Sequence, residues 1–171
     1  MYAYALYKNQ TNPILKYSLQ AGGGTITETL LDEDMETDPG WTTGGSQDEW
    51  DWGICRGGPG VAHSGSRCYG TDMRGSDYRY NRNADCYVRT GWIDLDGYTT
   101  ATLEFYDWYE IEDGYDYVYL QIYDDDTWAW HTIASFTGNQ QSWTHKSYDL
   151  SSYAGKSIRI RWLLDSDSSV R

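Results

Sequence analysis

The sequence predicts an all-β protein, a jelly-roll β-sandwich with an extended N-terminal arm. Aromatic residues make up 16% of its 171 residues, with nine Trp and seventeen Tyr against two Phe, and such amphipathic rings favour half-buried strands. Eighteen glycines punctuate the chain, which is typical of many short strands joined by turns. No segment of ten or more residues keeps the 3.6-residue apolar period of a helix.

Predicted strands follow one another from residue 25 onward. The run 117–123 alternates most clearly, and the run 157–164 places Ile158, Ile160 and Trp162 on one face. Asp113-Gly114 and Gly44-Gly45-Ser46 read as turns, and the glycine-rich residues 53–76 read as a long ordered loop. We expect strands at residues 25–31, 86–90, 92–95, 102–110, 117–123, 128–136 and 157–164.

Residues 1–24 form a candidate arm that differs in composition from the domain at 25–171. The first 27 residues contain two lysines and no acid, so they carry +2, whereas the rest of the chain carries −15. The spacing of the apolar residues in the arm predicts one or two short extended segments, interrupted at Asn12-Pro13. The three glycines Gly22-Gly23-Gly24 predict a flexible joint after them. An alternative is that the arm is an ordinary first strand of the body's own sheet. The candidate interface residues of the arm are Tyr2, Tyr4, Leu6, Ile14, Leu15, Tyr17 and Leu19.

The charge and hydropathy of the chain exclude several partner classes. A net charge of −13 argues against nucleic acid and against anionic membrane surfaces, because both would repel the chain. No run approaches eighteen apolar residues, so we expect no membrane span. The first ten residues lack the pattern of a signal peptide, so a secreted form would already be mature. The acidic residues serve solvation or offer oxygen ligands to a hard cation such as calcium.

Cysteine and asparagine residues give two weaker signals. Cys55, Cys68 and Cys86 are disulfide candidates that allow at most one internal bridge, and their spacing does not fit a zinc site. The pattern Asn9-Gln10-Thr11 makes Asn9 a possible acceptor of N-linked glycan.

Several sequence blocks occur together in an order that resembles a known family. The order is similar to that of the bacterial MAM-like accessory β-sandwich found in immune-inhibitor-A-type metallopeptidases and other secreted proteins, over about residues 30–170. The resemblance implies a jelly-roll fold, an extracellular or cell-surface location and a structural calcium ion, and it does not imply catalysis. The blocks that carry it are residues 34–36, 40–42, 48–50, 57–72, 92–95, 103–105, 108–109, 148–151 and 153–156.

The resemblance also implies a set of calcium ligands. It places Asp34, Glu36 and the region of Ser64 around the ion, with Asp165 or Asp72 as a further ligand. In an extended segment, the residue between Asp34 and Glu36 would face the core while both carboxylates share the other face. The glycine-rich loop can add carbonyl oxygens. An alternative is that these acids are solvated turn residues, which is how we interpret the acids of 110–116 and 124–126.

The resemblance implies a missing strand and hence a function. In that family a further strand follows the block at 166–170, whereas this sequence stops at Arg171, which implies a groove with unpaired backbone groups. We expect residues 2 to about 19 to fill the groove of a neighbouring copy by strand addition. Donor and acceptor surfaces differ, so the contact would propagate into an open fibre, a homopolymer. Two alternatives stay open: the arm fills its own groove, or the protein continues past Arg171 and has no groove.

The second functional hypothesis is a calcium-stabilised carbohydrate- or protein-binding module that accompanies a secreted enzyme or adhesin. Glycans would stack on exposed Trp rings, although core and edge packing is the alternative use of Trp50, Trp52, Trp128, Trp130 and Trp143. We expect no enzymatic activity, because the three His residues are isolated and the motifs HExxH and GxSxG are absent.

Overall fold

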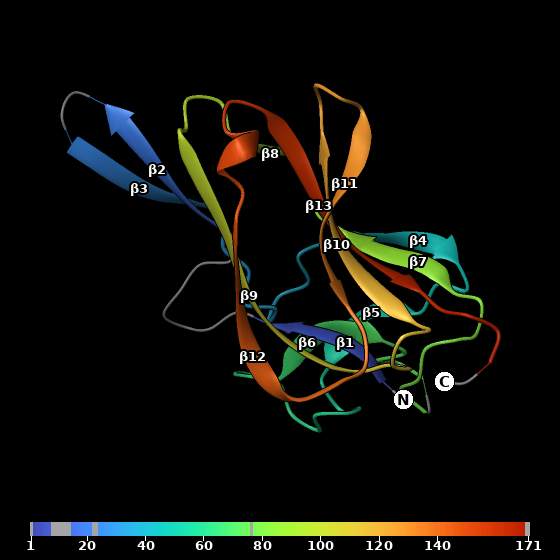
Figure 1. The fold of residues 1–171 in the computed structure, drawn as a ribbon. Coiled ribbons are helices and arrows are strands. Elements are labelled where there is room, and N and C mark those ends of the chain that lie inside the picture. Colours follow the sequence, from blue (N-terminus) through green and yellow to red (C-terminus); the bar gives the residue numbers. More distant parts are fainter. Residues whose placement is uncertain (1, 8–14, 22–23, 76, 170–171) are drawn as a thin grey trace.

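The computed structural model describes residues 2–7, 15–21, 24–75 and 77–169 and confirms the all-β class (Figure 1). Two antiparallel sheets pack face to face as a sandwich, joined by turns and one short 3-10 helix, η1 (Ser151–Tyr153). No helix within these residues is long and apolar enough to span a membrane.

One sheet has seven strands and contains the arm. Its path runs in the order β3-β2-β9-β1-β6-β5, and β12 pairs with the other edge of β9. The strands are β1 (Tyr2–Tyr7), β2 (Leu15–Ala21), β3 (Gly24–Leu31), β5 (Trp50–Ile54), β6 (Arg67–Thr71), β9 (Thr100–Glu110) and β12 (Asn139–Asp149).

The other sheet has six strands in the order β11-β10-β13-β7-β4, with β8 beside one end of β13. Strands β10 and β13 alternate strictly between buried and half-exposed residues, as the sequence pattern predicts. The strands are β4 (Thr42–Ser46), β7 (Asp85–Arg89), β8 (Ile93–Asp94), β10 (Tyr117–Asp124), β11 (Ala129–Phe136) and β13 (Ser157–Asp165).

The sequence predictions fail in the polar and glycine-rich strands. Gly44-Gly45-Ser46 belongs to β4 rather than to a turn, because Gly44 and Gly45 pair with Tyr87 and Cys86 of β7. The expected loop at 53–76 contains β6, which forms a hairpin with β5. The long strand β12 has the polar sequence NQQSWTHKSYD and is mostly exposed or half-exposed, so it shows no apolar alternation.

A stack of aromatic rings joins the two sheets in the core. The ring of Trp41, which precedes β4, lies between Tyr69 of the seven-stranded sheet and Trp162 of the six-stranded sheet. The ring centroids are 5.4 Å and 5.7 Å apart, with interplanar angles of 7° and 8°. Phe105 meets Trp162 edge to face at 5.4 Å. Such offset and edge-to-face pairs add to the stabilisation by burial alone.

The arm forms two strands along one edge of β9. Leu15 and Ser18 of β2 pair with Leu103 and Thr100, and Ala21 pairs with Gly24, so β2 and β3 form a hairpin. That hairpin extends away from the sandwich (Figure 1). Gly24 therefore lies in a strand, while Gly22 and Gly23 lie outside the described residues.

Candidate functional site

The first candidate site is the place that β1 occupies in the seven-stranded sheet. Strand β1 lies between β9 and β6 and pairs with both in antiparallel orientation. Ala5 pairs with Trp108, and Leu6 pairs with Asp107 on one side and with Tyr69 on the other. We call the place between β6 and the second half of β9 the β1 slot. Without β1, two strands that are both interior to the sheet would present unpaired backbone groups.

The arm residues predicted as an interface set are placed by this pairing. Tyr2, Tyr4 and Leu6 belong to β1, and Leu15, Tyr17 and Leu19 belong to β2. Ile14 and the glycosylation candidate Asn9 lie outside the described residues. The arm therefore contains two extended segments, β1 and β2, where the sequence predicted one or two, and in this structure both pair within the chain's own seven-stranded sheet.

The segment around Glu36 is a second candidate site. Its carboxylate Oε1 accepts hydrogen bonds from the backbone N–H of Ser66 at 2.7 Å and of Arg67 at 2.9 Å, and Oε2 accepts one from Ser66 Oγ at 2.9 Å. The bond from the Ser66 N–H is the main reason that the pKa of Glu36 lies below its usual range. Gly65 adopts a left-handed backbone with φ of 62°, and a Cβ there would also crowd Glu36 Oε1, so glycine is favoured where the loop passes over the carboxylate.

The extended conformation predicted for residues 34–36 is wrong. Met35 is fully buried, as expected, but it adopts a left-handed backbone with φ of 61°, which lies outside the extended region. Asp34 Oδ1 accepts the backbone N–H of Glu36 at 3.0 Å and so stabilises a bend. Asp34 thus stabilises its own segment, whereas the Glu36 carboxylate holds the backbone of the distant Ser66–Arg67 segment.

The remaining predicted calcium ligands have different surroundings. Ser64 lies in the same loop as the partners of Glu36. Asp72 accepts the backbone N–H of Tyr78 at 2.9 Å, while Asp165 ends β13 opposite Asp85 of β7. The structure therefore brings Asp34, Glu36 and the Ser64 loop together, while Asp72 holds the backbone N–H of Tyr78 and Asp165 lies opposite another acid, Asp85.

One group of three carboxylates among the described residues has the spacing of a cation site. Oxygen atoms of Glu112, Asp116 and Asp167 lie within 4.8 Å of one another. Asp116 is fully buried, and it accepts the Tyr80 hydroxyl at 2.6 Å and the Asp167 backbone N–H at 2.7 Å. The prediction that acids 110–116 are all solvated is therefore wrong for Asp116.

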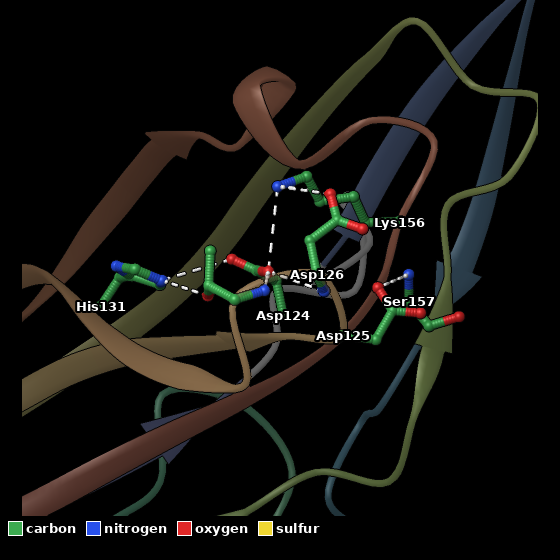
Figure 2. Close-up of polar contacts among 7 residues, drawn as sticks. Asp124, Asp125, Asp126, His131, Lys156 and Ser157 are labelled. Atoms are coloured by element: carbon green, nitrogen blue, oxygen red, sulfur yellow. Dashed lines mark hydrogen bonds and ion pairs between the residues drawn. The ribbon is translucent and has the colours of Figure 1, made fainter.

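A second buried acid, Asp124, organises the turn after β10. It is 2% exposed, and its Oδ1 accepts the backbone N–H groups of Asp126 and Thr127 at 3.0 Å and 2.8 Å. Lys156 Nζ lies 3.8 Å from Asp124 and 3.2 Å from Asp126, and Figure 2 shows Lys156 and His131 approaching Asp124 from different sides. Burial opposes ionisation, but the Thr127 bonds and the Lys156 charge outweigh it and lower the pKa of Asp124.

The alternation of inward and outward residues along β10 also applies to the two buried acids at its ends. Residues 118, 120 and 122 of β10 face the core, and positions 116 and 124 continue the same period of two. Reading each acid against the alternation of its neighbours would have identified Asp116 and Asp124 as buried.

The surroundings of His131 show why it does not form a catalytic triad. His131 Nε2 lies 2.8 Å from Thr127 Oγ1 and 3.3 Å from Asp124 Oδ2. A triad uses the two ring nitrogens separately, one toward the nucleophile and one toward the acid. Here a single nitrogen meets both groups, so the ring cannot pass a proton between them. Of the other two His residues, His63 stacks on Tyr106 at 3.8 Å, and His145 lies 3.7 Å from Glu104.

Of the tryptophans considered for glycan stacking, most pack against the protein and one is exposed. Trp50 is buried, while Trp52 and Trp143 donate their indole N–H groups to the carbonyls of Met35 and Val61. Trp130 packs beneath a guanidinium group at 4.0 Å, and Trp128 is 74% exposed. Packing thus accounts for most of this set.

All three cysteines are free and buried. The Cys68 thiol interacts with that of Cys55, and this contact together with burial raises the pKa of Cys68 well above its usual value. Burial raises the pKa of Cys86 to about 12. The structure therefore brings Cys55 and Cys68 together and gives Cys86 surroundings of its own.

Comparison with known proteins gives one relationship that extends over most of the chain. No family model matches the sequence, so the particular family inferred from the sequence blocks stays a prediction. The chain is similar to part of Bacillopeptidase F from Bacillus subtilis (strain 168), with 32% identity over 139 residues. These residues are 81% of this chain and 10% of that protein, so the match spans about a tenth of the peptidase's length.

Proposed function

We propose that the chain is a non-enzymatic structural subunit of an extracellular or cell-surface fibre, in which the arm of one copy fills the β1 slot of the next. The observation that carries the proposal is the interior position of β1. The first strand of the sequence pairs on both of its edges with strands that lie far away in the sequence, and residues 8–14 separate it from β2.

Exchange of the arm would preserve every contact that β1 makes within one chain. The same registers, Ala5 with Trp108 and Leu6 with Tyr69, would form between copies instead. Swapping an identical element is therefore a low-cost route to assembly, and a contact between different surfaces that does not close yields an open filament. Linker length and subunit concentration then decide between the closed and the exchanged form.

Imaging of a matched pair of variants at Ala5 tests the proposal. In the Ala5→Pro variant, proline removes a backbone donor from an interior strand, which abolishes pairing in the slot. Ala5→Ser is the matched control, because serine keeps the backbone donor. We expect filaments in negative stain from the wild type and from Ala5→Ser, and none from Ala5→Pro. Discrete particles from the wild type would contradict the fibre.

Calcium belongs to the proposal as a structural ion. Carboxylate and carbonyl oxygens are its preferred ligands, and both the Glu36 loop and the group of Glu112, Asp116 and Asp167 offer them. We expect added calcium to raise the thermal midpoint and a chelator to lower it. Asp167→Asn and Glu36→Gln, compared separately, would assign the ion to one site. A thermal midpoint of unfolding that changes neither with calcium nor with the chelator would contradict the proposal of a structural calcium ion.

The similarity to Bacillopeptidase F favours a second candidate function, a non-catalytic module that accompanies a secreted enzyme. A segment equal to 10% of a peptidase is more compatible with an attached module than with a complete catalytic domain. In this function the module binds a glycan or a protein, and it works without exchange of the arm. A glycan-binding screen that gives equal affinity for the wild type and for Ala5→Pro would favour this candidate.

A further inference from the structure

The outer face of the six-stranded sheet carries an unusual distribution of charge. Along β13, the half-exposed or exposed residues Arg159, Arg161, Leu163 and Asp165 alternate with buried ones. Along β7, the outward residues are those at 85, 87 and 89. The opposite face packs into the sandwich core.

Two like-charged pairs lie across the same two strands of this face. Asp165 of β13 pairs with Asp85 of β7, and four residues away Arg161 pairs with Arg89. Like charges directly opposite in a sheet are destabilising. Leu163 and Tyr87 form the pair between them. We call these six residues the bipolar face, since one end is acidic and the other is basic.

Neither end of the bipolar face is neutralised within the described part of the chain. No carboxylate of the described residues forms an ion pair with Arg89 or Arg161, and the Nε atom of Arg89 is buried without a hydrogen-bond partner. Burial and the neighbouring charges of Asp85 and Asp116 raise the pKa of Asp165. The partners of Arg161 within the chain are neutral: its Nε donates to Gln121 Oε1 at 2.7 Å, and its guanidinium lies 4.0 Å from the centre of the Trp130 ring. Buried polar groups normally have partners, so the unpartnered Nε of Arg89 and the uncompensated charges at both ends point to a partner outside the chain.

The centre of the bipolar face is flat. A Cβ on Gly44 would lie 3.0 Å from the Tyr87 hydroxyl, so the Tyr87 ring extends over the glycine of the adjacent strand β4. The guanidinium groups of Arg89 and Arg161 each lie 5.6 Å from the centre of that ring. A flat face with an apolar middle suits a second sheet stacked on it at roughly 10 Å.

We propose that the bipolar face binds the bipolar face of a second copy of this chain through a twofold axis that crosses the strands at Leu163. Reversing the strand direction about this point places Arg161 opposite Asp165 of the second copy and Arg89 opposite Asp85 of the second copy. Each repulsive pair of the single chain then faces the opposite charge. Such a self-complementary surface is typical of a twofold interface. The inference does not depend on exchange of the arm.

Paired charge reversals test this interface with an internal rescue. Variant X carries Asp85→Lys and Asp165→Lys, and variant Y carries Arg89→Glu and Arg161→Glu. When two copies of X meet, all the charged residues on both bipolar faces are positive, so the copies repel each other. When two copies of Y meet, all these residues are negative, and the copies repel each other as well. In a mixture, each end of X meets an oppositely charged end of Y. A control with Asp96→Lys and Asp113→Lys makes the same change in net charge as X at two exposed turn residues.

Native mass spectrometry and sedimentation at about 0.15 M salt, where exposed charges are screened beyond about 8 Å, give the readout. We expect the wild type and the control to pair, and X or Y alone to pair about 100-fold more weakly, since like-charge contacts cost several kcal/mol. The mixture should yield a one-to-one X–Y pair. Rescue also shows that both variants fold. A wild type that does not pair, pairing of X or Y alone at wild-type strength, or a mixture without rescue would overturn the proposal.

Discussion

Leu6 of β1 lies opposite Tyr69 of β6, and through this strand pair the β5–β6 hairpin reaches the rest of the seven-stranded sheet. Among the described residues, β6 has no other strand neighbour than β1 and β5. The six residues of β1, Tyr2–Tyr7, therefore hold one end of the sandwich together.

Deletion of residues 1–7 tests how much stability β1 supplies. We expect the free energy of unfolding in urea to fall by roughly 3–6 kcal/mol, because several net hydrogen bonds of about 1 kcal/mol each are lost along both edges of the strand. A synthetic peptide of residues 1–21 added to the deletion variant should restore most of the loss by filling the β1 slot. If the peptide has no effect, the slot does not accept a strand from outside the chain, and the exchange model fails.

Replacement of Trp41 by alanine tests the aromatic stack that joins the sheets. The side chain is 9% exposed and lies between rings from both sheets, so we expect a loss of about 3–5 kcal/mol in chemical denaturation. Trp128→Ala is the matched control, since that side chain is 74% exposed and its loss should change stability by less than about 0.5 kcal/mol. Equal effects of the two variants would contradict the description of the core.

The parts of the fold that sequence reasoning predicted are those where a single strand carries its own signal. Strands β10 and β13 alternate between apolar and half-exposed residues, so their existence and inward faces follow from a period of two. Strand β4 has no such signal, because Gly44 and Gly45 form a strand only through their pairing with β7. The left-handed conformation of Met35 likewise could not be predicted, because it accompanies complete burial of the side chain, which the adjacent residues in the sequence do not indicate.

The site depends still more on pairing between distant segments. The composition of the arm indicated an extended segment, but the insertion of β1 between β6 and β9 joins residue 6 to residues 69 and 107. The register of β7 against β13 decides that Arg161 meets Arg89 and that Asp165 meets Asp85. Sequence alternation gives the face of a residue and leaves its neighbour across the sheet undetermined.

Stability at low pH should depend on Asp124. Its pKa in the folded protein lies below the usual value of 3.8, so its contribution is present above about pH 4 and is lost as the pH falls through the folded-state pKa. We expect Asp124→Asn to be less stable than the wild type at pH 6, and the difference to shrink toward pH 2.5 in urea unfolding.

The exposed turn residue Asp96 provides the control for this experiment. Asp96→Asn should leave both the stability at pH 6 and its decline with acid close to those of the wild type. A difference between Asp124→Asn and the wild type that stays constant from pH 6 to pH 2.5 would show that the pKa of Asp124 is the same in the folded and unfolded states, which would contradict this account.

Oxidation should produce one specific disulfide. The Cys55 and Cys68 thiols interact, so we expect a mild oxidant to join them, while buried Cys86 remains a thiol. Because the pKa values of Cys68 and Cys86 are raised, little thiolate is present at neutral pH and the reaction should be slow and faster at high pH. Peptide mapping by mass spectrometry identifies the bridge, and a bridge to Cys86 would contradict this assignment.

The most direct test of arm exchange is a cysteine pair placed across the β1 slot. Tyr2 of β1 pairs with Glu110 of β9, and directly opposed strand residues are close enough for a disulfide. The variant with Tyr2→Cys and Glu110→Cys is oxidised under filament-forming conditions and analysed on a non-reducing denaturing gel. Exchange predicts a ladder of covalently linked chains, and the two variants that carry only one of the substitutions, Tyr2→Cys or Glu110→Cys, should give no ladder. A single band at the monomer position with an internal disulfide would show that each arm fills its own slot and would contradict the proposed fibre.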